Sequence, residues 1–209
     1  RVVVQFSVEK DLFYQSISSK YTTQLREKAM TVWESLMDTS IVFKPALVIN
    51  HNTSEKEIFI QDLSNTIYLV NGTGRILWKQ GISESINSEV MQLDYYKNGK
   101  LQLIFSTENY LHIIDRNGNY VERYPVRLRE KASAGMALFD YEGNRNYRIF
   151  IPCVDGNIYA YSKEGNIVSG WQFPGSDNEV RTPLSHFRID DKDFIVIART
   201  DAIAAVGGG

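Results

Sequence analysis

One hairpin pattern occurs three times along the chain, and this repeat limits the folds that the sequence can adopt. Each copy is an apolar run, a four-residue turn and a second apolar run: YLVNGTGRILW from Tyr68, HIIDRNGNYVERY from His112 and YAYSKEGNIVSGW from Tyr159. Each turn begins with Asn, Asp or Ser and ends with Gly, as in a type I turn closed by a left-handed glycine. We expect the first side chain to hydrogen-bond the turn backbone. The closing glycines are Gly74, Gly118 and Gly165.

Two further apolar runs precede each hairpin, so each unit is predicted to hold four antiparallel strands, a to d. The runs are short, rich in β-branched and aromatic residues, and separated by polar or glycine-bearing loops. A period of about 45 residues with four strands is typical of a β-propeller blade. We therefore predict an all-β protein, a β-propeller made of four-stranded antiparallel blades. The predicted a strands are 46–50, 90–94, 136–140 and 184–188, and the predicted b strands are 57–61, 101–105, 148–152 and 193–197.

An aromatic residue closes each predicted strand d. Such a ring, placed at the same position of every blade, is expected to be buried against the next blade, where it removes a large apolar area from water. Regular spacing distinguishes this arrangement from unrelated core aromatics. The four residues, about 45 positions apart, are Trp33, Trp78, Tyr124 and Trp171.

The ends of the chain match parts of a blade rather than whole ones. The first resembles strands b, c and d and the last strands a, b and c, and these cannot merge into one four-stranded blade without duplicating strands. We therefore expect an incomplete arc, with a longer native gene or self-association through open propeller edges. The predicted whole blades are 45–80, 90–126 and 135–173, and the partial blades are 1–44, with a short helix over 23–30, and 183–206.

The first hairpin resembles the tryptophan-docking motif of pyrroloquinoline-quinone-type β-propellers. In that motif a turn glycine precedes the closing tryptophan by four residues, as Gly74 precedes Trp78. The other two units depart from it, because Tyr124 replaces the tryptophan and Trp171 lies two residues further from its glycine. The resemblance implies either a quinone-dependent dehydrogenase or a non-enzymatic, protein-binding scaffold of a bacterial periplasm or cell surface.

Enzymatic signatures are missing from the sequence. The quinone enzymes of the resembling family often carry a pair of adjacent cysteines, whereas this chain has the single Cys153. The three histidines are spread over different units, without a hydrolase or metalloprotease motif. The loop from Asp140 to Asn146 offers oxygen donors at alternate positions, but its glycine and closing residue do not fit a calcium loop, and we interpret it as an ordinary hairpin loop. We expect no catalytic residue, cofactor or metal.

Composition and charge indicate which partners to expect. The net charge is −2, which gives no general attraction to nucleic acid, and no apolar run approaches the roughly 20 residues that span a bilayer. In a propeller the b–c and d–a loops share one face, and rigid loop faces are where such folds bind partners. We predict a protein partner there; the alternative is an enzyme or a carbohydrate- or ligand-binding propeller whose site lies in blades outside this chain. The candidate residues are Glu108, Asn109, Tyr110 and Asp155 from b–c loops, and Arg127, Arg129 and Arg181 from d–a loops.

Overall fold

The computed structural model describes residues 2–10, 12–19, 31–171, 173, 175, 180–190, 192–198 and 203–207. The described part of the chain contains β-strands and no helix, and therefore no helix that could cross a membrane. The chain divides into two compact units, residues 1–34 and residues 35–209. The helix expected over 23–30 lies outside the described residues.

The first unit contains one hairpin, formed by β1 (Val2–Glu9) and β2 (Leu12–Ser19). The two strands pair antiparallel over their whole lengths. No strand d follows in the described residues of this unit, because residues 31–34 are irregular. Trp33 differs from expectation accordingly: it lies outside any strand and is 37% exposed rather than buried.

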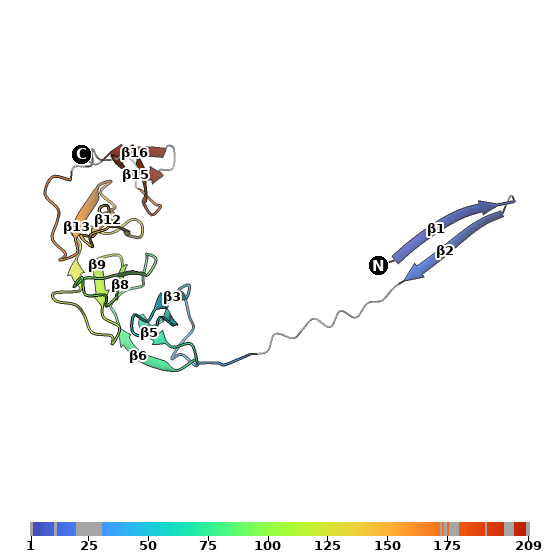
Figure 1. Ribbon diagram of the computed structural model, residues 1–209, viewed down its shortest axis with the longest axis horizontal. Coiled ribbons are helices and arrows are strands. Elements are labelled where there is room, and N and C mark those ends of the chain that lie inside the picture. Colours follow the sequence, from blue (N-terminus) through green and yellow to red (C-terminus); the bar gives the residue numbers. More distant parts are fainter. Residues whose placement is uncertain are drawn as a thin grey trace. The chain divides into compact units, whose positions relative to one another are not determined.

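The second unit consists of four antiparallel sheets that follow one another in chain order (Figure 1). Each is a meander in which neighbours in sequence are neighbours in the sheet. The first sheet is β3 (Ala46–Ile49), β4 (Lys56–Gln61), β5 (Thr66–Val70) and β6 (Ile76–Gly81); the second is β7 (Met91–Leu93), β8 (Gln102–Ser106), β9 (Tyr110–Ile114) and β10 (Val126–Arg127). The third is β11 (Ala137–Phe139), β12 (Arg148–Pro152) and β13 (Ile158–Ser162); the fourth is β14 (Ser185–Ile189), β15 (Lys192–Ala198) and β16 (Ile203–Gly207).

The core lies between consecutive sheets, because the central strands bury both of their faces. On β8, Leu103 and Phe105 pack toward the first sheet, while Ile104 between them packs toward the third. This follows from the two-residue period of a strand, which sends alternate side chains to opposite faces. A third cluster, which includes Phe150 and Ile195, joins the third sheet to the fourth. Each sheet thus supplies part of the core of its neighbours. This is needed because a single twisted sheet cannot bury its apolar faces alone.

The outer strand d varies more than the repeat predicts. In the second sheet the chain turns over residues 121–124, and β10 forms only after Pro125, which follows Tyr124 through a cis peptide bond. In the third sheet the described residues form no strand d, only a bridge between Tyr161 and Ile167. The third sheet therefore has three strands among the described residues, whereas the repeat predicts four, and Trp171 lies beyond its last strand.

The three hairpin turns share their glycine geometry but not their side-chain bonds. Gly74, Gly118 and Gly165 all have positive φ and donate their N–H to the carbonyl of the first turn residue. The Asn71 and Asp115 side chains accept hydrogen bonds from the turn backbone. The third turn differs from expectation, because the hydroxyl of its first residue, Ser162, is buried without a hydrogen-bond partner.

Candidate partner-binding face

The loops at one end of the sheets form a surface that we call the Arg129 face. It consists of the b–c loops 62–65, 107–109 and 153–157, and of the d–a connections 82–90 and 128–136. These loops belong to successive sheets of the second unit. The face therefore depends on how firmly each loop is joined to the next.

Backbone bonds join these loops at equivalent positions of the repeat. The segment entering each sheet forms a β-bridge with the end of that sheet's b strand: Ile41 with Asp62, Ile86 with Thr107, and Ala132 with Cys153. Between the second sheet and the connection that follows it, Leu128 N–H donates to the Asn109 carbonyl (2.9 Å) and Ala132 N–H to the Glu108 carbonyl (2.8 Å). The loops are thus held by the sheets and present a fixed backbone.

Glu84 ties the first d–a connection to the second sheet. Its carboxylate accepts hydrogen bonds from the backbone N–H and the side-chain amide of Asn109, at 2.9 and 2.8 Å. Burial raises the pKa of the Glu84 carboxyl, but the hydrogen bonds from Asn109 and Thr107 outweigh it and hold the pKa below its ordinary value. Glu84 is therefore ionised at neutral pH, and its carboxylate is hydrogen-bonded to Asn109 within the protein.

Arg129 is held over an aromatic ring of the next sheet. Its guanidinium lies 5.3 Å from the centre of the Tyr159 ring, a distance at which a cation is attracted to the ring face. The Tyr159 hydroxyl donates to the Asp155 carboxylate at 2.7 Å, and this bond raises the Tyr159 pKa to about 12. The Arg129 backbone N–H donates to the Tyr161 hydroxyl (2.9 Å). Arg129 and Asp155, predicted separately, thus belong to one cluster through Tyr159.

Arg127 and Tyr110 are paired across β10 and β9, so their side chains share one side of the second sheet. The sequence places Arg127 in a loop, whereas the structure places it in the two-residue strand β10. It remains exposed, and Tyr110 is half-buried. In the described part of the chain, no hydrogen bond or ion pair engages the Arg127 guanidinium.

The other predicted residues lie on the same face. Glu108 forms an exposed ion pair with Lys131 (3.1 Å), which links the second sheet to the connection that leaves it. Arg181 follows Val180, whose carbonyl accepts a hydrogen bond from the hydroxyl of Ser133 in that same connection (2.6 Å). The structure therefore brings all seven candidate residues to one end of the second unit.

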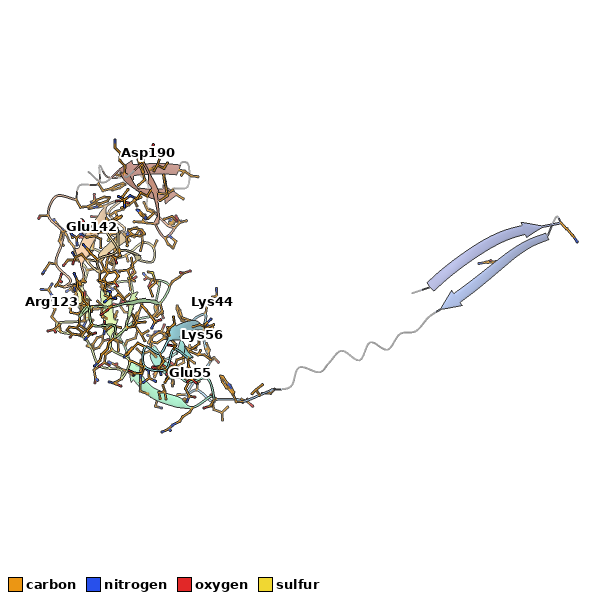
Figure 2. The ribbon with its side chains drawn as sticks, viewed as in Figure 1. Lys44, Glu55, Lys56, Arg123, Glu142 and Asp190 are labelled. Carbon is orange, nitrogen blue, oxygen red and sulfur yellow. The ribbon has the colours of Figure 1, made fainter. Side chains whose placement is uncertain are left out.

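The opposite ends of the sheets carry a second loop surface, the Arg145 face, made of the a–b loops 50–55, 94–101 and 140–147 and the c–d turns. Here ion pairs join consecutive sheets. Arg145 donates to the buried Asp94 carboxylate (2.7 Å), and the Arg116 guanidinium pairs with the buried Glu57 carboxylate. His51 is half-buried, and its Nδ1 accepts a hydrogen bond from the Leu101 N–H (3.1 Å). Figure 2 labels Glu142, which lies in the 140–147 loop.

Closing aromatics dock on the turn of the next sheet. The Trp78 Nε1–H donates to the Arg116 carbonyl (2.7 Å), and the Trp78 ring covers Gly118 so closely that a Cβ there would lie 3.0 Å from it. The Tyr124 hydroxyl donates likewise to the Lys163 carbonyl in the third turn (2.7 Å). Trp171 differs, because its Nε1–H donates to Ile158 of its own sheet (2.8 Å) while its ring packs in the core shared with the fourth.

His112 is buried beside the Arg129 face and is 1% exposed. Its ring stacks on Phe105, with ring centres 4.8 Å apart, and its Nδ1 lies 3.0 Å from the Tyr120 hydroxyl. Burial lowers the His112 pKa to about 4, although the nearby Glu84 charge partly opposes this. The ring is therefore neutral at physiological pH and acts as a packed polar group of β9.

The described residues contain no group of three or more His, Cys, Asp and Glu side chains arranged to hold a metal ion. In the loop with alternating oxygen donors, the Asp140 carboxylate accepts hydrogen bonds from the loop's own Asn144 and Arg145 N–H groups. Cys153 is buried, and burial raises the pKa of its thiol to about 12, so it is un-ionised at neutral pH.

Comparison with solved structures decides the fold. Two crystal structures of BBS1N in complex with ARL6DN match the chain with TM-scores of 0.58 and 0.59, at 11% and 14% identity, over 81% and 78% of this chain. The fold is a β-propeller. BamB from Moraxella catarrhalis also matches, with a TM-score of 0.49 and 17% identity over 72% of this chain. The chain spans about half the length of these proteins: 52%, 50% and 42%.

The comparisons support the β-propeller fold and go no further at this identity. No protein-family model and no curated protein sequence matches the chain. Membership of the quinone-type family stays a prediction from the hairpin motif.

Sequence reasoning missed three residues of the propeller's Arg129 face: Glu84, Lys131 and Tyr159. Glu84 and Lys131 lie in predicted d–a loops, so the loop position was a signal that each could reach a neighbouring blade. Tyr159 is the first residue of the third hairpin, and its contact with Arg129 depends on how two blades are placed side by side.

Proposed function

We propose that this protein is a non-enzymatic scaffold that binds a protein partner through the Arg129 face. The observation that carries the proposal is the joining of loops from successive blades into one surface, which includes Arg129 over the Tyr159 ring and the paired residues Arg127 and Tyr110. Arginine and tyrosine are enriched among the residues that dominate binding energy at interfaces. Loops already fixed by internal bonds lose little entropy when a partner binds.

Two further observations support the proposal. The polar clusters of the described blades are engaged in bonds that hold the fold, such as Glu84 with Asn109 and Asp94 with Arg145. BBS1N, a propeller of similar fold, was solved in complex with ARL6DN. By the family resemblance of its first hairpin, we place the scaffold outside the cytoplasm of a bacterium, which cell fractionation tests.

Photo-crosslinking in the native cells tests the function. A photoreactive phenylalanine analogue replaces Tyr110 on the Arg129 face, and in a second protein it replaces Tyr96, an exposed tyrosine on the Arg145 face. We expect a discrete protein adduct from position 110 and none from position 96. An adduct from position 96 alone, or none from either position, would contradict the proposal.

A further inference from the structure

The acidic and basic side chains of the Arg129 face differ in how many partners they have within the protein. Glu108 is paired with Lys131, Asp155 accepts from Asn157 and Tyr159, and Glu84 accepts twice from Asn109. These carboxylates therefore already have donors within the protein. A partner gains little by offering them further donors.

Arg127 and Arg129, by contrast, have no such partners among the described residues. In the described part of the chain, no hydrogen bond or ion pair engages the guanidinium groups of Arg127 and Arg129, and the latter is held only over the Tyr159 ring. Their planar N–H donors thus have no acceptor among the described residues, and carboxylates are the acceptors that fit them in two-bond geometry. Glu130, next in sequence, is exposed and opposes part of this positive charge.

We propose that the partner segment recognised by this face is acidic, and that its carboxylates bind Arg127 and Arg129 beside Tyr110 and Tyr159. This inference rests on the proposed function and specifies the chemistry of its partner. The cross-strand pairing of Tyr110 with Arg127 and the ring contact of Tyr159 with Arg129 give two arginine–tyrosine pairs. The tyrosine rings provide apolar surface for the segment's backbone and aliphatic groups.

Binding of defined probes tests the inference. The probes are a short fluorescent glutamate-rich peptide, its glutamine twin of equal length, and a single-stranded oligothymidylate, measured by anisotropy at low and moderate salt. We expect the glutamate peptide to bind, the glutamine twin not to bind, and salt to weaken binding. Arg127→Ala with Arg129→Ala should weaken it at least about tenfold, with Arg127→Lys and Arg129→Lys intermediate.

Two variants serve as controls. Glu130→Gln should tighten binding of the glutamate peptide, because it removes the opposing charge, whereas Lys97→Ala with Lys100→Ala, exposed lysines of the Arg145 face, should leave it unchanged. All variants change exposed side chains, and a thermal melt checks that they remain folded.

Four results overturn the inference. The glutamine twin binds as tightly as the glutamate peptide, the oligothymidylate binds more tightly than the glutamate peptide, or the glutamate peptide does not bind at all. The fourth is an equal loss of affinity for the glutamate peptide from Lys97→Ala with Lys100→Ala and from Arg127→Ala with Arg129→Ala. If an adduct at position 110 is nevertheless found, the scaffold function stands and only the acidic chemistry fails. If no adduct is found, the proposed function fails as well.

Discussion

At the scale of single residues, the contact of Trp78 with the following blade gives the sharpest stability prediction. Its indole packs edge-to-face on Phe59, covers Gly118 and donates to the Arg116 carbonyl. Trp78→Ala should lower the free energy of unfolding by about 3 kcal/mol, the usual cost of removing a large packed ring. Urea denaturation measures it.

Trp33 provides the matched control for Trp78, since the repeat predicts the same role for both. Because Trp33 is exposed and outside any strand, Trp33→Ala should change the free energy of unfolding by less than about 0.5 kcal/mol. Equal losses from the two variants would contradict the exposed position of Trp33.

A substitution at Gly118 tests the contact between the Trp78 ring and the turn of the next blade. Gly118 and Gly99 have nearly equal positive φ, 88° and 82°, but a Cβ at Gly99 meets nothing within 4 Å. Gly99→Ala should therefore cost only the left-handed conformation, about 1 kcal/mol. Gly118→Ala should cost about 1 kcal/mol more, because its methyl group would press on the Trp78 ring. Equal costs in thermal or urea melts would rule out a close contact.

Residue chemistry predicted the turns well and their contacts less well. The three glycines were recognisable because Asn, Asp or Ser followed by glycine at the fourth place favours one turn type. The sequence did not indicate that the Ser162 hydroxyl lacks a hydrogen-bond partner, because this depends on how that short side chain is oriented within its turn. Arg129 and Tyr159 are about 30 residues apart on different blades, and no local pattern pairs them.

At the scale of elements, β9 carries a pH-dependent contribution to stability through His112. Its pKa is about 4 in the folded protein, against 6.5 for an unperturbed histidine. The unfolded chain therefore binds the proton more readily, so this contribution is present above pH 6.5 and is lost as pH falls toward 4. Lowering the pH from about 7.5 to about 5 should reduce the free energy of unfolding by about 2 kcal/mol.

His112→Gln separates this effect from that of the carboxylates. The pKa values of Asp62 and Asp94 lie below the ordinary value for aspartate, so these groups lose their contributions only at lower pH. Urea melts of the variant should lack the loss of stability between pH 7.5 and 5. An unchanged pH dependence would assign the loss to another group.

The inner strands of each blade were predictable and the outer strand was not. Strands b and c are short apolar runs that bury both faces, so their sequences alone identify them, as in β8 and β9. Strand d has one outer edge without a partner, and local chemistry can displace it. In the second blade Pro125 has no N–H to donate, and β10 starts after it.

At the scale of the whole molecule, the repeat predicts the propeller because each blade needs its neighbours. The fold is confirmed by the sheets and by the comparison with BBS1N, whereas the partner and its location remain proposals. Self-association through uncovered blades also stays a prediction. Exposed apolar side chains on the edge strand β3, Leu47 and Ile49, are the surface on which it would depend.

The central claim is that partners bind the Arg129 face. Hydrogen exchange measured with and without the protein recovered by crosslinking at position 110 tests it most directly. We predict slower exchange on binding in residues 107–110, 127–133 and 153–157, and no change in the loops 94–101 and 140–147 of the Arg145 face. Slower exchange in those two loops, with the first three segments unchanged, would contradict the claim.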